Sequence, residues 1–421
     1  MKFSQYNVNL EMEYGLLVYN TNTTEVMKIK KAELVEHYND LLASDNLSLE
    51  DQLTKVLYDK KFIIDDNIDE FEEAKKYQYS LIERKNKELN ILIHVTDNCN
   101  FRCVYCFKKA QPKNLSDENW ENLYLYLKKS FEANKFKSVS LDFYGGEPLL
   151  RYNKIVEFMK KVNNLIKLYP EIKLKYSMTT NGFLLTKEKY DTLVSLGLSF
   201  FQVTLDGFEE THNKMRPQVD GSGSWTKIIE NLRYVNSVED KTIIAVRTNF
   251  NKINKQEIDE FNVWLKEQFQ NEKFYFTKVP VTKYSEEVCD DLVLDRYDDF
   301  AQKQCSDELK EDALFALRSH GMVCRNTNKN NFTLSTSGKI SYCEEVDDEN
   351  TIIAELVDGG DINYRVPYET WCTRLEVEEC KTCVVYPLCL ARSCSKVRKC
   401  GIVLADFENI KKNIKLGKVF D

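Results

Sequence analysis

Three cysteines stand close together in the sequence, directly after the apolar run ILIHVT. Cys99, Cys103 and Cys106 have the spacing C-x3-C-x2-C, so one loop can bring three thiolates to a single inorganic centre. A four-iron cluster held by three cysteines keeps one iron open for an external ligand. A structural zinc site instead requires four closed ligands, and no fourth ligand is obvious near this loop. Tyr105 precedes the last cysteine, where its ring could pack against a bound nucleoside.

Polar motifs follow the next three apolar runs. GGEP (145–148) offers two glycines for a close backbone approach to a ligand and a carboxylate suited to an ammonium group. TNG (180–182) and TLDG (204–207) offer hydroxyl, amide and carboxylate groups suited to ribose hydroxyls. On the run TIIAVRTNF, Arg247 and Asn249 could meet a planar carboxylate, which suits a guanidinium fork. Taken singly, each of these groups is also an ordinary turn or strand-end residue.

Six apolar runs alternate with helical segments between residues 90 and 284. Strands that are buried on both faces and joined by helical crossovers predict a parallel α/β core, either barrel-like or doubly wound. In both architectures, ligands gather at the carboxyl ends of the strands. The cysteine loop and the polar motifs all follow such ends, so we expect them to form one site.

The cysteine loop, GGEP, TNG and TLDG together resemble the radical S-adenosylmethionine (radical SAM) superfamily across residues 90–284. The resemblance implies a partial (β/α)6 TIM-like barrel. It also implies that S-adenosyl-L-methionine chelates the open iron of a 4Fe–4S cluster, and that one electron from the cluster yields a hydrogen-abstracting 5′-deoxyadenosyl radical. The cluster ligands would be Cys99, Cys103 and Cys106; the cofactor-binding residues would be Tyr105, Gly145, Gly146, Glu147, Asn181, Thr204, Asp206 and Arg247.

The segment THNKMRP follows TLDG and contains His212 and Arg216. These two residues are similar to a pattern in the peptide-modifying branch of the superfamily. A role in starting a helix is equally compatible with the sequence.

The last hundred residues hold a second group of cysteines, which begins with Cys324-x13-Gly338-x4-Cys343. The order resembles the SPASM domain, which binds auxiliary four-iron clusters, although Cys394 follows Cys389 one residue later than in that pattern. The resemblance implies an outer cluster on Cys380, Cys383, Cys389 and Cys400 and an inner one on Cys324, Cys343 and Cys394. Cys372 could complete the inner set, or that site could stay open for a substrate thiolate. One or two structural zinc sites are the alternative, because C-x2-C is also a zinc spacing.

Other polar residues near the second group have less specific readings. Glu344 follows Cys343 and is a candidate general base, but the acidic residues after it also fit a solvated turn. Cys289 and Cys305 have no partner pattern and are expected to be ordinary thiols.

The first 62 residues predict a small sheet followed by two amphipathic helices, AELVEHYNDLL and LEDQLTKVLYDKK. This module resembles the winged-helix-like element by which peptide-maturing enzymes hold a leader peptide. The physical basis would be β-augmentation, in which an extended leader adds a strand to a sheet edge.

Composition limits the remaining possibilities. With 421 residues and a net charge of −8, the chain is expected to contain several domains and not to bind nucleic acid non-specifically. No signal peptide or membrane span is apparent, so we expect a cytoplasmic protein in which most of the thirteen cysteines bind metal. The expected domains are a leader-recognition-like module (1–88), a radical SAM core (89–284), a helical bridge (285–320) and a loop-rich, cysteine-rich iron–sulfur domain (321–421).

The function expected from the resemblance is a peptide maturase that installs an intrapeptide crosslink, either thioether or carbon–carbon, in a ribosomally made precursor. Its partners would be a precursor peptide with a leader sequence and an electron donor such as flavodoxin or ferredoxin. One alternative is a sulfatase-type maturase that forms formylglycine. A zinc-stabilised binding protein is the alternative from another class.

Overall fold

The structure is a computed structural model that describes residues 1–108, 110–281, 292–293, 328–342, 351–367, 378–389 and 411. The chain divides into two compact units. The N-terminal unit contains Met1–Arg84 with Leu309–Thr327 and Thr373–Asp421, and the core unit contains Lys85–Glu308 with Asn328–Cys372.

The N-terminal unit is a small α+β module built on an antiparallel meander in the order β2-β3-β4. Its short strands β1 and β5 form a second antiparallel pair. Tyr38, Leu57 and Phe62 are fully buried between the meander and the helices. The elements are β1 (Lys2–Phe3), β2 (Asn7–Met12), β3 (Gly15–Asn20), β4 (Val26–Ile29), α1 (Ala32–Leu42), α2 (Gln52–Asp59), β5 (Ile63–Ile64) and α3 (Glu70–Lys85).

A short C-terminal segment also belongs to the N-terminal unit. It contains the 3-10 turn η5 (Glu378–Thr382) and α12 (Tyr386–Cys389). The Tyr386 ring lies 4.7 Å from the ring of Phe71, at the start of α3. Thr21 also donates a hydrogen bond to the carbonyl of Val384, so this segment is tied to the module at two points.

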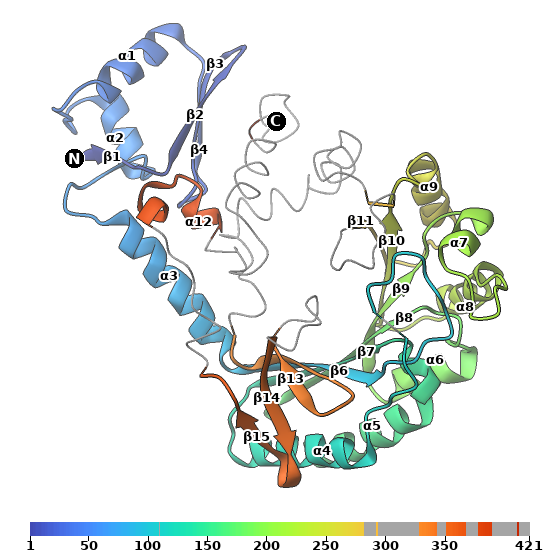
Figure 1. The fold of residues 1–421 in the computed structure, drawn as a ribbon. Coiled ribbons are helices and arrows are strands. Elements are labelled where there is room, and N and C mark those ends of the chain that lie inside the picture. The colour runs from blue at the N-terminus through green and yellow to red at the C-terminus, as the bar shows by residue number, and fades with distance from the viewer. Residues whose placement is uncertain are drawn as a thin grey trace. The chain divides into compact units, whose positions relative to one another are not determined.

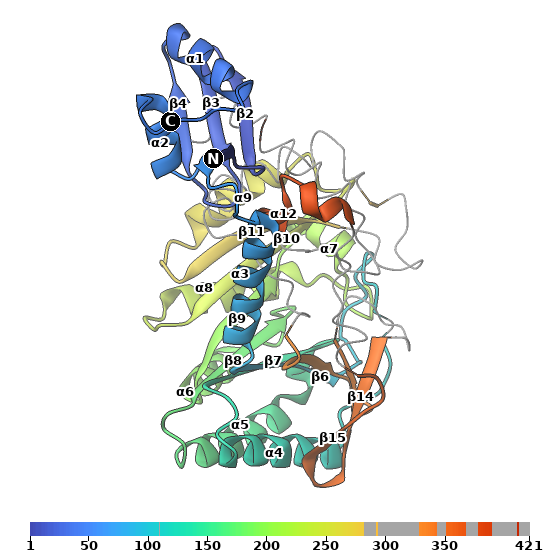
Figure 2. The same cartoon turned by 90° about the vertical axis from the view of Figure 1, so that its left-hand side faces the viewer.

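The core unit is organised around six parallel strands that neighbour one another in chain order, from β6 to β11. Figures 1 and 2 show the crossover helices on one side of this curved sheet. Sequential strand order with all helices outside is the arrangement of a barrel and not of a doubly wound sheet, so the predicted barrel-like α/β core is confirmed. The strands are β6 (Glu88–Thr96), β7 (Ser138–Gly145), β8 (Lys173–Thr180), β9 (Leu198–Thr204), β10 (Ile243–Phe250) and β11 (Phe274–Pro280).

The helices cover the outer face of these strands and close the main hydrophobic core. Side chains alternate along each strand, so Ile91, Ile93 and Val95 of β6 pack against the helices, while Leu92 and His94 point to the inner face. On β7, Ser140 and Asp142 also face inward, so the inner face is the more polar one. The helices are α4 (Asp117–Glu132), the 3-10 turn η1 (Pro148–Arg151), α5 (Tyr152–Ile166), α6 (Lys187–Ser195), α7 (Glu209–Met215), α8 (Trp225–Ser237) and α9 (Ile258–Gln268).

Four later strands extend the same sheet beyond β6. β12 (Asn331–Leu334) pairs with β6 in parallel, and β13 (Lys339–Ser341), β14 (Ile352–Val357) and β15 (Asp361–Tyr364) continue antiparallel. The 3-10 turn η4 (Asp358–Gly360) joins the last two strands. Gly360 lies so close to the backbone of α4 that a Cβ would overlap the amide nitrogen of Tyr126, so this turn packs directly on the helix layer.

Among the residues that the structure describes, no helix is long and apolar enough to cross a membrane.

A buried cation stabilises the amino-terminal side of the sheet. The Lys273 side chain is 3% exposed, and its Nζ lies 3.2 Å from Asp240 Oδ2 and 3.2 Å from the Tyr190 hydroxyl. The same Nζ donates a 2.7 Å hydrogen bond to the carbonyl of Val238. These contacts join α6, the segment between α8 and β10, and the residue that precedes β11.

We expect Lys273→Met to lower the free energy of unfolding by about 2 kcal/mol, because the substitution leaves a partly buried carboxylate without its cation. Urea unfolding of the purified protein measures this change. Lys227→Met is the matched control: Lys227 is 46% exposed and pairs with Glu230 on the surface, so little change is expected. Equal effects of the two substitutions would contradict the role given to Lys273.

Candidate functional site

The predicted motifs meet at the carboxyl ends of neighbouring strands. The cysteine loop follows β6, GGEP follows β7, TNG follows β8 and TLDG follows β9. Because these four strands are adjacent and parallel, their ends lie along one edge of the sheet. The structure therefore brings the motifs together as expected.

The glycines of GGEP pack against the backbone that leads into the cysteine loop. Gly146 donates a 2.7 Å hydrogen bond to the carbonyl of Thr96, and Glu147 donates a 2.9 Å hydrogen bond to the carbonyl of Asn98. A Cβ on Gly145 or Gly146 would overlap those same two carbonyl oxygens, and Gly145 also has a φ of +133°. Glycine is thus required here because two chain segments touch.

The Glu147 carboxylate is completely buried and bonds to protein donors. It accepts hydrogen bonds from the Thr180 hydroxyl at 2.7 Å, from the Asn181 amide at 2.7 Å and from the Leu149 amide at 3.0 Å. Burial raises the pKa of Glu147, and the three donors act in the opposite direction. In this geometry, Glu147 joins GGEP to TNG; a contact with a cofactor ammonium stays a prediction.

The three cysteines of the loop are all free thiols, with Cys99 and Cys103 half-buried and Cys106 exposed. Burial raises the pKa of the Cys103 thiol to about 12, and the Arg216 cation lowers it. Among the described residues, no three His, Cys, Asp or Glu side chains are gathered tightly enough to hold a metal ion. At neutral pH a thiol with such a raised pKa keeps its proton, and it becomes a thiolate when a metal centre binds the sulfur in place of the proton.

Tyr105 lies at the centre of a buried hydrogen-bond network. Its hydroxyl donates to Asp206 and accepts from Arg216, and the Asn249 side-chain amide donates to it at 3.0 Å. Arg216 Nη1 also lies 3.4 Å from Asp206 Oδ2, and both side chains are almost fully buried. Burial raises the pKa of Asp206, and Arg216 opposes this shift. The network ties the cysteine loop to TLDG, α7 and β10.

His212 contacts this network through the backbone of Asp206 and through Ser224. The Asp206 amide donates to His212 Nδ1 at 3.2 Å, so Nε2 carries the ring proton and donates to the Ser224 hydroxyl at 3.1 Å. The Ser224 hydroxyl in turn donates to the carbonyl of Arg216 at 2.9 Å. Burial keeps the pKa of His212 well below its usual value, so the ring is neutral. Both residues of THNKMRP thus position Asp206.

Arg247 and Thr204 are register partners on β10 and β9. Arg247 Nε donates a 2.8 Å hydrogen bond to the side-chain oxygen of Asn249. The backbone amide of Asn249 donates to the Asp206 carboxylate at 2.7 Å. Asn181 bonds to the cysteine loop instead, because its side-chain amide donates to the Asn100 side-chain oxygen Oδ1 at 2.8 Å. Asn181 after β8 and Asp206 after β9 are therefore both linked to the cysteine loop, the first through Asn100 and the second through Tyr105.

Two residues of this site were not predicted from the sequence. Asn100, directly after Cys99, bonds to TNG as described. Asn254 donates to the carbonyls of Asp206 at 2.7 Å and Asn249 at 2.9 Å, which fixes the turn after β10. The signal in the sequence was the asparagine-rich segment NFNKIN, whose side chains favour local bonds to the backbone.

The donors around the three thiols fit an iron–sulfur cluster. Arg216 Nε and Asn100 Nδ2 are buried and have no hydrogen-bond partner among the described residues. Arg216 lies close enough to Cys99 and Cys103 to lower the pKa of both thiols. Orphaned N–H donors and a cation beside three thiols suit an anionic cluster, whose sulfurs accept such hydrogen bonds.

Most of the C-terminal candidates lie outside the described residues. Cys380 and Cys383 are half-buried and pack against the cluster that contains Tyr6, Phe71 and Tyr386. The candidates outside the described part of the chain, or whose side chains are, are Cys324, Cys343, Glu344, Cys372, Cys389, Cys394 and Cys400. Their roles stay predictions.

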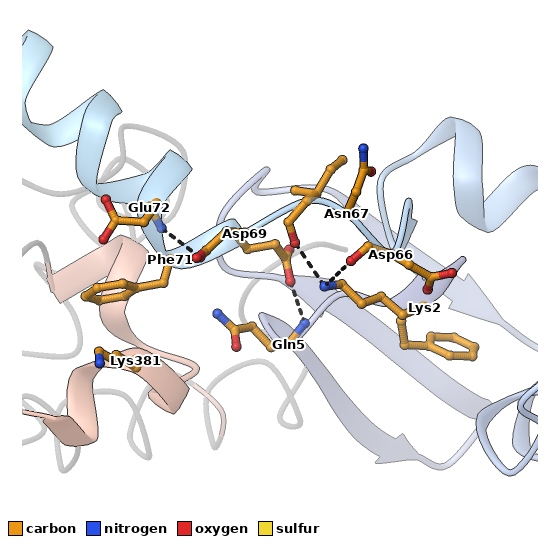
Figure 3. Close-up of a pocket in the computed structure, with 11 residues that line it drawn as sticks. Lys2, Gln5, Asp66, Asn67, Asp69, Phe71, Glu72 and Lys381 are labelled. Atoms are coloured by element: carbon orange, nitrogen blue, oxygen red, sulfur yellow. Dashed lines mark hydrogen bonds between the residues drawn. The ribbon is translucent and has the colours of Figure 1, made fainter.

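The N-terminal unit contains a separate open pocket of about 620 Å³. Figure 3 shows Lys2 reaching the backbone at Asp66, and its Nζ donates to the carbonyls of Asp66 and Ile68. The buried Glu70 accepts hydrogen bonds from Ser4 and the Gln5 amide. None of the residues that line this pocket was a predicted site residue, and these bonded charges stabilise the fold of the unit.

We expect Asp206→Ala to lower the free energy of unfolding by about 3 kcal/mol, because it leaves the Arg216 guanidinium buried without its carboxylate partner. The melting temperature of the purified protein, followed by circular dichroism, measures the loss. Asp220→Ala is the control, since Asp220 is exposed and accepts hydrogen bonds from Ser222 in its own loop. If both variants have the melting temperature of the wild type, the buried pair does not stabilise the site.

Comparison with known proteins agrees with this geometry. The family model of the radical SAM superfamily matches residues 93–265. The chain is 28% identical over 254 residues to the radical SAM cyclopropyl synthase TigE of Paramaledivibacter caminithermalis, which covers 56% of this chain and 50% of TigE. It is 29% identical over 191 residues to a cysteine-type anaerobic sulfatase-maturating enzyme of Clostridium novyi, covering 43% and 49% of the two chains. The chain thus spans about half the length of these curated relatives.

Solved structures show the same fold. The structure of anSMEcpe with bound AdoMet and the Kp18Cys peptide superimposes with a TM-score of 0.59 at 19% identity, covering 78% of this chain and 99% of that one. SuiB of Streptococcus suis bound to S-adenosylmethionine superimposes with a TM-score of 0.51 at 15% identity, covering 92% and 94%. At these identities the likeness concerns the fold. With the family match, the strand order and the cysteine loop in agreement, this chain carries a radical SAM domain at residues 93–265.

Proposed function

We propose that this chain is a radical SAM peptide maturase that abstracts hydrogen from a ribosomally synthesised precursor and installs an intrapeptide crosslink, either thioether or carbon–carbon. The observation that carries the proposal is the buried network that ties the cysteine loop, through Tyr105, to Asp206, Arg216 and Asn249. A 4Fe–4S cluster with S-adenosyl-L-methionine bound supplies a 5′-deoxyadenosyl radical in this family. The side chains of this chain then hold, orient and enclose the reacting groups.

The three loop cysteines would hold the cluster, and the network would keep the loop in one position. Arg216 supplies a fixed positive charge beside Cys99 and Cys103, which favours their thiolates. Thr204, Asp206 and Asn181 lie at the strand ends where nucleoside hydroxyls would be bound. Arg247, with its guanidinium anchored by Asn249, is the candidate for the cofactor carboxylate.

The inner face of the sheet would receive the peptide. Its side chains are more polar than those of the outer face, and the site forms the carboxyl-terminal rim of that face. Two structural neighbours support a peptide substrate, because SuiB and anSMEcpe were both solved with peptides bound. The acidic Glu344 stays a candidate general base.

The N-terminal unit would bind the leader of the precursor. In the described residues, β2 and β4 are the two edges of the meander, because each pairs only with β3. An extended peptide segment can add to such an edge as a further strand. Binding the leader there would raise the local concentration of the core peptide at the radical.

Auxiliary clusters complete the proposal. Cys380 and Cys383 lie in one turn, because the Cys383 amide donates to the Cys380 carbonyl at 3.3 Å. Such a turn can present both thiols to one metal centre. Together with the other C-terminal cysteines they would hold two auxiliary 4Fe–4S clusters, reduced by a cytoplasmic donor such as flavodoxin or ferredoxin.

A sulfatase-type maturase that converts Cys or Ser to formylglycine is the second candidate. The superposition on anSMEcpe covers 99% of that chain, and the Clostridium novyi relative carries the same activity in its name. A formylglycine maturase acts without a leader peptide. The fate of a precursor peptide therefore separates the two candidates.

Protein purified without oxygen is expected to be brown and to contain iron, whereas the zinc-stabilised binding protein would be colourless and contain zinc. Cys103→Ala removes one of the three loop ligands, so it should abolish the formation of 5′-deoxyadenosine from S-adenosyl-L-methionine while the auxiliary iron is retained. Chromatography of the reaction measures the product. Continued formation of 5′-deoxyadenosine by this variant would contradict the assignment of the loop.

A short reading frame beside the gene is expected to encode the precursor. Incubated with the enzyme, a reductant and S-adenosyl-L-methionine, that peptide should lose two hydrogens, because a crosslink joins two atoms that each gave up one. Mass spectrometry measures the change, and deletion of the leader should abolish it. An unchanged mass would contradict the maturase proposal, and formylglycine on a sulfatase peptide would favour the second candidate.

A further inference from the structure

The segment that follows α7 pairs with the cysteine loop. Residues 215–219 and residues 100–104 form a short antiparallel ribbon, in which Phe101 and Gln218 are bridge partners. Its register is fixed by the hydrogen bonds from the Arg102 amide to the Pro217 carbonyl at 2.8 Å, from the Val104 amide to the Met215 carbonyl at 3.0 Å and from the Val219 amide to the Asn100 carbonyl at 3.0 Å. In this register Arg216 lies directly opposite Cys103, in the kind of pair whose side chains come close together.

The Arg216 side chain is buried at this point, with 8% of its surface exposed. Its guanidinium carbon lies 5.8 Å from the centre of the Phe101 ring, which belongs to the same loop as Cys103. Nη1 bonds to the Tyr105 hydroxyl and lies 3.4 Å from Asp206 Oδ2, whereas the buried Nε has no hydrogen-bond partner among the residues that the structure describes. One N–H group of a buried cation is therefore left for an acceptor that these residues do not supply.

A second N–H donor of the ribbon is in the same situation. The Asn100 side-chain oxygen accepts from Asn181, and its buried Nδ2 has no partner in the described part of the chain. A buried N–H group without an acceptor is costly, so two of them beside the three cysteines indicate that an acceptor binds there. The sulfurs of an iron–sulfur cluster accept such bonds, and these bonds are one of the factors that set the reduction potential of the cluster.

Charges of both signs act on the loop thiols. Burial raises the pKa of the Cys103 thiol most, and after burial Arg216 lowers that pKa while Asp206 raises it. Burial also raises the pKa of Cys99, where Glu147 adds to the shift and Arg216 opposes it. Arg216 is thus a cation that acts on two of the three thiols, and its carboxylate partner Asp206 acts on one of them in the opposite direction.

We infer that Arg216 sets the reduction potential of the cluster on the cysteine loop, through an Nε–H hydrogen bond to a cluster sulfur and through its charge, which Asp206 partly balances. This inference rests on the proposed function, because it requires a cluster at this loop. A cluster that accepts an electron becomes more negative, so a fixed cation that donates a hydrogen bond stabilises the reduced form. Arg216 thereby makes the cluster easier to reduce by the external electron donor.

A redox titration of the full-length, reconstituted protein tests the inference without turnover. Dithionite and mediators set the potential in the absence of S-adenosyl-L-methionine, and electron paramagnetic resonance follows the reduced clusters. The part of the signal that Cys103→Ala lacks belongs to the loop cluster, so its midpoint potential is read separately from those of the auxiliary clusters. Iron content is determined for each variant, and midpoint potentials are compared only between proteins with the wild-type content.

Arg216→Gln is expected to make reduction of the loop cluster about tenfold less favourable, which lowers the midpoint potential by about 59 mV for one electron. Asp206→Asn should raise the midpoint potential, because Arg216 then keeps its charge without a counter-charge. Both substitutions break the same ion pair, so a loop that was merely loosened would shift the midpoint potential in the same direction in both variants.

Arg102→Gln is the matched control. Arg102 belongs to the same loop but is exposed, and its Nη1 donates to the carbonyls of Cys99 and Phe101. Water screens an exposed charge, so the midpoint potential should change much less than in Arg216→Gln. The other charged groups on the inner face and near its rim are the same in all these proteins and cancel in the comparison; they include Lys108, Asp142, Lys175 and Arg247.

The wild type provides an independent check of the hydrogen bond. In protein labelled with ¹⁵N only in arginine, pulsed electron paramagnetic resonance of the reduced loop cluster should detect a coupling to ¹⁵N, because the Arg216 Nε lies next to a cluster sulfur. The coupling should persist in Arg102→Gln and be lost in Arg216→Gln.

A wild-type loop cluster without this coupling overturns the inference, even where a variant fails to fold or to hold its cluster. An unchanged midpoint potential in Arg216→Gln does the same, as does a shift of Arg216→Gln and Asp206→Asn in the same direction. Failure of the proposed function is seen separately, because the wild type would then give no four-iron signal that depends on Cys103, or would leave the mass of the precursor unchanged.

Discussion

The site depends on a buried ion pair, Arg216 with Asp206, that is completed by the hydroxyl of Tyr105. Two charges taken out of water cost several kcal/mol unless their remaining hydrogen bonds are made, so the partners must be placed accurately. The Asn249 backbone amide donates to the Asp206 carboxylate from the neighbouring strand, and His212 of α7 accepts from the Asp206 backbone amide, which holds the chain at this residue. The ion pair thereby fixes Tyr105, which precedes Cys106, and so fixes the position of the cysteine loop.

The barrel edge provides the frame in which this pair can form. Four consecutive parallel strands end side by side, and each contributes a short polar motif. GGEP joins the first two ends through backbone contact, because Gly145 and Gly146 leave no room for a Cβ beside Thr96 and Asn98. The result is one continuous set of hydrogen bonds from β6 to β10.

Much of the fold could be predicted because it is encoded locally. The amphipathic stretch AELVEHYNDLL became α1 with the same ends, and the six apolar runs became β6 to β11. The choice between a barrel and a doubly wound sheet was left open, because strand order depends on how the helices pack and not on any single run. The extension by β12 to β15 was missed, since strands of three to six residues carry little periodic signal. In the site, the residue types were predictable but their partners were not: Glu147 bonds to Thr180 and Asn181, and Asn100 and Asn254 entered only through three-dimensional contact.

The central claim is that three thiolates of one loop hold a cluster with one open iron. Electron paramagnetic resonance of the reduced protein, recorded before and after addition of S-adenosyl-L-methionine, tests it most directly, because only a cluster with an open iron can bind the cofactor and change its spectrum. The account predicts that part of the four-iron signal changes on addition of the cofactor in the wild type, and that this change is absent from Cys103→Ala, in which only the auxiliary clusters remain. A spectrum that does not respond to the cofactor, or the same response in the variant, would contradict it.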